Sequence, residues 1–119
     1  MTANGVFTGE AIEQAIAEGM IRLGGERDVR QVQPSSLDLT LGDRAYRIRA
    51  SFLPGAGHTV EDRLAGDLVM HEFPLGDGAV LERGCVYLVP LREQLALPAD
   101  VSAMANPKSS TGRIDVFVR

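Results

Sequence analysis

The sequence of 119 residues has a single cysteine and no tryptophan. Cys85 therefore cannot form a disulfide within the chain, and it cannot build a zinc site of several thiolates. The two histidines, His58 and His71, stand apart from each other and from Cys85. We expect both to be surface or capping residues rather than metal ligands. The sequence therefore predicts no zinc centre.

Long apolar runs and an excess of basic residues are also missing. No segment approaches the roughly 20 consecutive apolar residues of a membrane-spanning helix. The first residues lack a basic stretch followed by an apolar one, so we expect no signal peptide and a cytoplasmic location. The formal net charge of −4 argues against a nucleic-acid polymer as partner, because such proteins usually present a basic face. A small anionic ligand is still compatible with this charge.

The length and composition predict one folded domain. A chain with 45% hydrophobic and 24% charged residues is typical of globular proteins. Its length suits one domain and is too short for two ordinary ones. We therefore expect residues 1–119 to belong to a single domain.

One short helix is expected near the N-terminus, over residues 8–18. Thr8 is a suitable N-cap, and Gly19 is a suitable stop after the last turn. Ile12 and Ile16 recur at a spacing of four residues, which gives the helix one apolar stripe.

The remainder of the sequence predicts short strands. Alternating apolar residues or short apolar runs, punctuated by glycine and proline, are typical of such strands. The expected strands cover residues 37–41, 46–48, 79–81, 85–91, 101–105 and 114–118, with an edge segment at 95–97 and a helical turn or two within 60–70. Short strands at close spacing favour a barrel or sandwich over a parallel α/β fold. The sequence thus predicts a mainly β fold with an N-terminal helix.

A loop near residue 110 is rich in hydrogen-bond donors. Residues 106–113 read Asn-Pro-Lys-Ser-Ser-Thr-Gly-Arg. Lys108 and Arg113 carry cationic N–H groups, and Ser109 and Ser110 carry hydroxyls. Hydrogen bonds assisted by charge are roughly twice as strong as neutral ones, which suits phosphate oxygens. The loop is therefore predicted to bind a phosphate.

Three segments in order resemble the deoxycytidine triphosphate deaminase branch of the trimeric deoxyuridine triphosphatase superfamily. Residues 33–42 are similar to the first family motif, an aspartate (Asp38) in an alternating strand before a glycine turn. Residues 95–101 are similar to the approach to the family's phosphate loop. The third segment resembles the Arg-Ser-Ser-x-x-Arg signature, with Lys108 in place of the first arginine. The residue order of this loop is more similar to that in the N-terminal part of the longer bacterial members than to that in the compact members.

The resemblance implies a fold and an assembly. It implies a distorted β-barrel or jelly-roll of the deoxyuridine triphosphatase type, incomplete in this chain, that assembles as a homotrimer with active sites between subunits. The implied ligand is a deoxynucleoside triphosphate, bound together with Mg²⁺. The implied reaction is the zinc-independent hydrolytic deamination of deoxycytidine triphosphate (dCTP) to a deoxyuridine nucleotide and ammonia, in pyrimidine deoxynucleotide biosynthesis.

The resemblance also assigns roles to residues of the loop. Lys108, Ser109, Ser110 and Arg113 match positions that hold the phosphates, and Ser109 with Arg113 matches the catalytic pair that places the water and stabilises the tetrahedral intermediate. Lysine for arginine exchanges a planar fork for a point charge. Asp38 matches an aspartate near the metal and the subunit interface, although it could equally be a strand-end residue that bonds to a turn.

One catalytic group of the family has no match in this sequence. The general-base glutamate would lie in a strand after the loop, beyond Arg119, whereas Glu82 and Glu93 precede the loop. Asp115 is expected in a strand with its carboxylate toward solvent. Two other readings stay open: a deoxyuridine triphosphate diphosphatase, because the phosphate loop is shared across the superfamily, and a non-catalytic β-domain for nucleotide binding or assembly.

Overall fold

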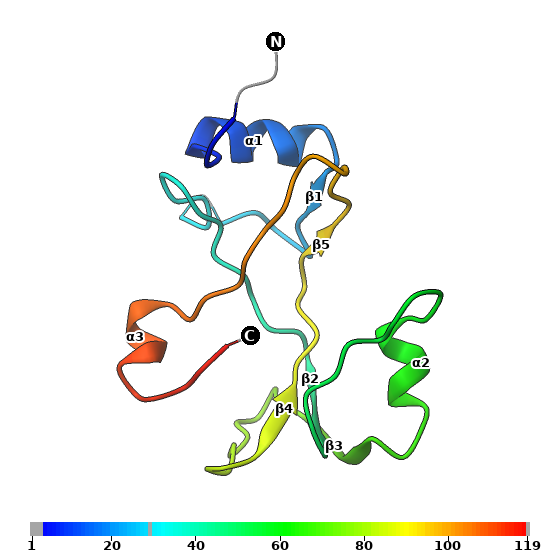
Figure 1. The fold of residues 1–119 in the computed structure, drawn as a ribbon. Coiled ribbons are helices and arrows are strands. Elements are labelled where there is room, and N and C mark those ends of the chain that lie inside the picture. Colours follow the sequence, from blue (N-terminus) through cyan, green and yellow to red (C-terminus); the bar gives the residue numbers. More distant parts are fainter. Residues whose placement is uncertain (1–3, 29, 119) are drawn as a thin grey trace.

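A computed structural model describes residues 4–28 and 30–118 of the protein. Within them the chain forms a small two-stranded sheet near the N-terminal helix and a three-stranded sheet at the opposite end of the molecule (Figure 1). The elements in chain order are α1 (Gly9–Ala17), β1 (Ile21–Arg22), β2 (Arg44–Ile48), α2 (Val60–Leu64), β3 (Val69–Pro74), β4 (Val86–Leu88), β5 (Gln94–Leu95) and α3 (Ser109–Gly112).

Helix α1 confirms the expected N-terminal helix. The Thr8 hydroxyl accepts a hydrogen bond from the Ala11 N–H at 3.3 Å, which caps the first turn. Gly19 follows the last turn with a φ of 81°, a conformation that glycine adopts without a Cβ penalty. The buried face of the helix, Ile12 and Ala15, packs with Ile21 of β1 into the upper core. Strand β1 pairs antiparallel with β5, so this core also fixes the chain near residue 95.

The three-stranded sheet, called the lower sheet from its place in Figure 1, has the strand order β3-β2-β4 and is antiparallel throughout. Its central strand β2 confirms the strand expected at residues 46–48 and buries Ala45 and Ile48. Phe73 of β3 lies opposite Ala45, and Val86 of β4 lies opposite Ile48. Helix α2 supplies the helical turn expected within 60–70 and begins with a capping box between Thr59 and Asp62.

Two extended segments connect the upper and lower parts, and they run side by side (Figure 1). The Gly42 N–H donates to the Pro90 carbonyl at 2.8 Å, and the Arg92 N–H donates to the Thr40 carbonyl at 3.0 Å. An added Cβ at Gly42 would lie 2.8 Å from the Pro90 oxygen. The backbones approach so closely at this point that only glycine fits.

Some of the expected strands are wrong. Residues 37–41 form no strand; Leu37 and Leu41 make only isolated bridges, because the Thr40 N–H bonds to a side-chain carboxylate instead of a ladder. Residues 101–105 and 114–118 pair with no strand of the described chain. After α3 the backbone turns, with Asp115 at a φ of 60°, so its carboxylate is exposed but not on a strand. Residues 79–81 are likewise unpaired, because β4 pairs with β2 instead.

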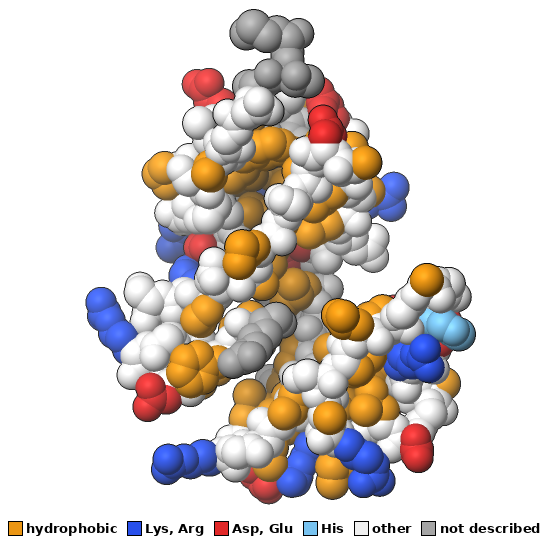
Figure 2. Space-filling view, viewed as in Figure 1, with side chains coloured by type: hydrophobic (Ala, Val, Ile, Leu, Met, Phe, Trp, Pro, Cys, Tyr) orange, Lys and Arg blue, Asp and Glu red, His pale blue; other side chains and the backbone are white. Residues whose placement is uncertain are grey.

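The molecule is open rather than closed. A folded monomer of 12.8 kDa is expected to expose about 6,300 Å² of accessible surface, whereas this chain exposes 9544 Å². Its radius of gyration of 16.0 Å exceeds the value of about 13.5 Å expected for a compact domain of this length. Large apolar side chains are exposed, among them Leu41, Leu53, Val80, Met104, Ile114 and Phe117, and apolar surface is spread over the face in Figure 2. No closed barrel forms among residues 4–28 and 30–118. Within the same residues no helix has the length and apolar character needed to cross a membrane.

Candidate phosphate-binding site

The donor-rich loop folds into one helical turn, where the sequence predicted a loop between two strands. Lys108 precedes α3 with an extended backbone, and its carbonyl accepts from the Gly112 N–H at 2.8 Å. The Arg113 N–H donates to the Ser109 carbonyl at 3.0 Å. Residues four positions apart lie on the same face of a helical turn, so Ser109 and Arg113 share one face. Lys108, Ser109, Ser110 and Arg113 are all exposed.

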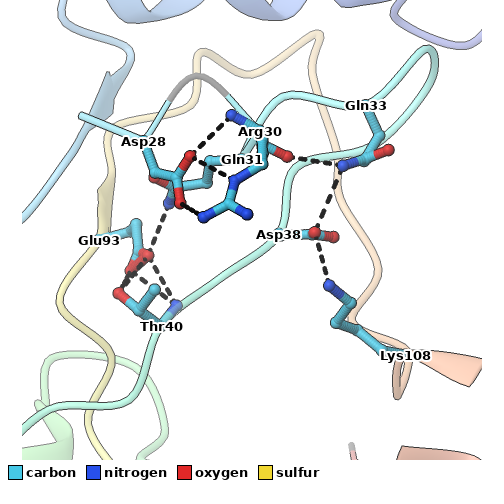
Figure 3. Close-up of polar contacts among 8 residues, drawn as sticks. All are labelled: Asp28, Arg30, Gln31, Gln33, Asp38, Thr40, Glu93 and Lys108. Atoms are coloured by element: carbon cyan, nitrogen blue, oxygen red, sulfur yellow. Dashed lines mark hydrogen bonds and ion pairs between the residues drawn. The ribbon is translucent and has the colours of Figure 1, made fainter. Parts of the chain in front are cut away.

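Lys108 and Asp38, singled out separately in the sequence, are in direct contact. The Lys108 Nζ lies 2.8 Å from Asp38 Oδ2, although the two residues are 70 positions apart (Figure 3). The Asp38 side chain is 25% exposed and the Lys108 side chain is 63% exposed. The segment around Asp38 and the donor-rich loop therefore meet through this ion pair.

Asp38 is held by the segment that precedes it. Its N–H donates to the Gln31 carbonyl at 2.9 Å. The Gln33 side-chain amide donates to the Arg30 carbonyl at 2.7 Å and approaches Asp38 Oδ2 at 3.5 Å. These contacts restrict the aspartate, whereas the long lysine chain reaches it from an exposed position.

A second, buried carboxylate fixes the same segment from the other side. Glu93 is only 7% exposed and accepts from the Gln31 amide at 2.9 Å and from both the N–H and the hydroxyl of Thr40 at 2.7 Å (Figure 3). Buried charges in proteins are paired or fully hydrogen-bonded, and Glu93 follows the second route. Sequence reasoning missed this residue. Its neighbours Arg92 and Gln94 are polar, and no local pattern indicates burial.

The polar segment ends in an exposed ion pair between Asp28 and Arg30. The Arg30 backbone N–H donates to Asp28 Oδ1 at 2.9 Å, and its guanidinium contacts both carboxylate oxygens at 3.2 Å. The guanidinium hydrogen bond, followed by the backbone one, holds the pKa of the Asp28 carboxyl below its usual value. The same carboxylate raises the pKa of Arg30.

Other residues singled out in the sequence lie apart from this cluster. No carboxylate of residues 4–28 or 30–118 pairs with Arg113. Glu82 pairs with Arg47 at 3.2 Å beside the lower sheet, and Glu93 is committed to Thr40 and Gln31. Among the described residues, neither glutamate has a hydrogen bond or ion pair with a residue of the loop.

The histidines have ordinary partners. His58 Nδ1 lies 3.9 Å from the Asp62 carboxylate, and the His71 ring stacks on Phe73 with centroids 5.5 Å apart. In the part of the chain that the structure describes, no three His, Cys, Asp or Glu side chains gather in the manner of a metal site. A shallow hollow of about 360 Å³ lies beside the lower sheet, and no loop residue lines it.

Comparison with known proteins decides the family. A sequence model of the 2'-deoxycytidine 5'-triphosphate deaminase N-terminal domain matches residues 3–119. The chain belongs to this family.

A solved structure of the 2'-deoxycytidine 5'-triphosphate deaminase from Agrobacterium tumefaciens is 57% identical in sequence to this chain and superposes on it with a TM-score of 0.84. It covers 93% of this chain, which in turn covers 33% of that one. The likeness confirms the expected mainly β fold of the deaminase type and the resemblance to the N-terminal part of a longer form.

Two curated relatives are more distant. A dUMP-forming dCTP deaminase from Methanobrevibacter smithii is 26% identical over 111 residues, which are 93% of this chain and 57% of that protein. A dCTP deaminase from Halorubrum lacusprofundi is 30% identical over 104 residues, which are 87% of this chain and 51% of that protein. The chain thus spans about half the length of the curated relatives that it matches.

Proposed function

We propose that this chain is the phosphate-binding part of a deaminase that converts dCTP and water into a deoxyuridine nucleotide and ammonia. Membership of the deaminase N-terminal family supports the substrate class. The observation that carries the proposal is the single helical turn that presents Lys108, Ser109, Ser110 and Arg113 together at the surface. Two cations and two hydroxyls in one turn match the oxygens and negative charge of a triphosphate.

The proposed roles follow from the chemistry of each side chain. The Lys108 ammonium and the Arg113 guanidinium neutralise phosphate charge, and the Ser109 and Ser110 hydroxyls donate to phosphate oxygens. Ser109 and Arg113, on one face of the turn, also place the attacking water and stabilise the negative charge of the tetrahedral intermediate. Because Lys108 offers a point charge in place of a fork, it constrains the phosphate direction less than an arginine would.

Mg²⁺ fits this proposal as a companion of the nucleotide. The loop offers cations and hydroxyls, which do not bind Mg²⁺ strongly, and the adjacent carboxylate of Asp38 is engaged by Lys108. The ion would therefore be held by the phosphate oxygens, where it neutralises part of their charge. No step of the proposed reaction requires zinc.

The general base belongs to sequence outside these 119 residues in this proposal. Deamination needs a group that activates water, and such groups contribute about 10²–10⁴-fold to the rate. Glu82 and Glu93 are both engaged elsewhere. These residues alone are therefore proposed to bind the nucleotide without useful turnover. A non-catalytic nucleotide-binding domain would give the same result for this chain. A homotrimer and a cytoplasmic location complete the proposal.

Isothermal titration with dCTP and Mg²⁺ tests the binding step. We expect saturable heat with the 119-residue chain and an affinity about tenfold lower for Ser109→Ala, because a hydrogen bond to a charged group is lost. Ser102→Ala is the matched control, since Ser102 is exposed outside the loop. The absence of heat at millimolar dCTP would refute the proposal. In a longer protein that includes these 119 residues, release of ammonia from dCTP would support deamination. Release of pyrophosphate without ammonia would instead support the diphosphatase.

A further inference from the structure

We propose that Asp38 is a specificity-determining residue. Its ion pair with Lys108 in the nucleotide-free protein lowers the affinity of the loop for an anion that binds mainly through Lys108. The inference rests on the proposed function, because it takes Lys108 to be a phosphate ligand. Its consequence is that single small anions, such as inorganic phosphate, bind the loop too weakly to compete with a triphosphate.

The geometry supports competition between Asp38 and the ligand for one ammonium group. Asp38 Oδ2 lies 2.8 Å from Lys108 Nζ, within hydrogen-bond distance. The aspartate is restrained by its backbone bond to Gln31 and by the approach of the Gln33 amide. An incoming phosphate must therefore either displace a carboxylate that is already in place or share the ammonium with it.

Both routes oppose anion binding. Displacement exchanges one charge-assisted hydrogen bond for another, so the gain at Lys108 is small. Sharing uses the three N–H donors of the ammonium, but it brings the carboxylate close to the phosphate oxygens, where like charges repel. The partial burial of Asp38 lessens the screening of this repulsion by salt.

A triphosphate binds the loop in spite of Asp38 because it gains contacts that a single phosphate lacks. Ser109, Ser110 and Arg113 are exposed in the same turn, and no described carboxylate pairs with Arg113. A ligand that spans several of these donors replaces the cost at Lys108 with binding elsewhere. A single phosphate that reaches only Lys108 has no such compensation.

The test measures the binding of two probes, inorganic phosphate and inorganic tripolyphosphate, to the 119-residue chain by calorimetry. We expect Asp38→Asn, which keeps the size of the side chain, to strengthen the binding of inorganic phosphate by roughly threefold to fivefold, the range that an exposed ion pair supplies. The binding of tripolyphosphate should gain less, because its contacts with the other donors of the loop do not involve Asp38. In the Lys108→Met background the same substitution should produce a much smaller gain. Asp43→Asn is the matched control: it makes the same change in net charge but breaks an exposed pair with Arg92 outside the loop.

The outcomes separate this inference from the proposed function. Three outcomes would overturn the role of Asp38 even if the parent binds dCTP. They are unchanged or weaker phosphate binding by Asp38→Asn, an equal gain for phosphate and tripolyphosphate, and an equal gain in the Lys108→Met background or with Asp43→Asn. A gain that depends on Lys108 in a protein that does not bind dCTP would support the inference and refute the proposed function. Circular dichroism of each variant checks that the fold is retained. If Asp38→Asn unfolds the chain, Asp38→Glu, which keeps the charge, should leave probe binding as in the parent, and a gain of threefold or more would overturn the inference.

Discussion

Thr40 donates both its backbone N–H and its hydroxyl to one oxygen of the Glu93 carboxylate, each at 2.7 Å. This double contact ties the strand-like segment that carries Asp38 to the segment that leads into β5. The position of Asp38, and through it that of Lys108, therefore depends on a buried carboxylate elsewhere in the sequence.

Removal of this carboxylate should destabilise the protein. Glu93→Ala leaves the buried Gln31 amide without its acceptor, and an unsatisfied buried donor costs about 1–3 kcal/mol. The exposed Thr40 also loses the charged acceptor of its N–H and hydroxyl. We expect a decrease of about 2–4 kcal/mol in the free energy of unfolding, measured by urea denaturation. Glu82→Ala, at an exposed pair, should change it by less than about 0.5 kcal/mol. Equal effects of the two substitutions would contradict the structural role of Glu93.

The close contact at Gly42 predicts a second loss of stability. Gly42→Ala places a methyl group 2.8 Å from the Pro90 carbonyl oxygen, so the paired backbones must separate. Overpacking of this kind costs about 1–3 kcal/mol, which thermal unfolding would detect. Gly76→Ala is the control, because an added Cβ at that position meets nothing within 4 Å.

Much of the local structure follows from the sequence, but the longer-range contacts do not. Helix α1 is predictable because Thr8, Gly19 and the apolar stripe are local signals. The alternation of residues 37–41 and 114–118 is an equally local signal, yet a strand also needs a partner, and neither segment has a ladder within the described chain.

The candidate site divides in the same manner. The composition of residues 106–113 is enough, without knowledge of the structure, to indicate hydrogen-bond donors suited to phosphate oxygens. The contact of Lys108 with Asp38 spans 70 positions, and that of Glu93 with Thr40 spans 53. No local pattern encodes such pairs. The helical turn α3 was missed because a polar stretch of serine, threonine and glycine has no apolar period.

Ligand binding should stabilise the chain through Lys108. A ligand that binds only the folded state at 100 times its Kd adds about 2.7 kcal/mol to the free energy of unfolding. We therefore expect dCTP with Mg²⁺ to raise the Tm, and Lys108→Met to reduce the rise modestly, because Lys108 exchanges Asp38 for a phosphate and its loss lowers the affinity by only about twofold to fivefold. Lys108→Arg should retain it, since the charge is kept. A Tm that is unaffected by dCTP would count against the proposed site.

The Asp28 carboxyl should titrate at a lower pH than an ordinary aspartate. Its pKa is depressed by the Arg30 guanidinium and backbone N–H, so the pair stabilises the fold above the unfolded-state pKa and loses this contribution as the pH falls through the folded-state pKa. Carboxyl carbon shifts in an NMR titration measure the pKa directly. Arg30→Ala should return it toward the usual value, whereas Arg22→Ala, a change on β1, should not.

The large accessible surface of this chain has a consequence for its unfolding. The urea m-value scales with the surface that becomes newly exposed when a protein unfolds. A chain that already exposes 9544 Å² has less left to expose than a compact domain of equal length. Its m-value and its heat-capacity change of unfolding should both be small for 119 residues, and the denaturation curve should be broad.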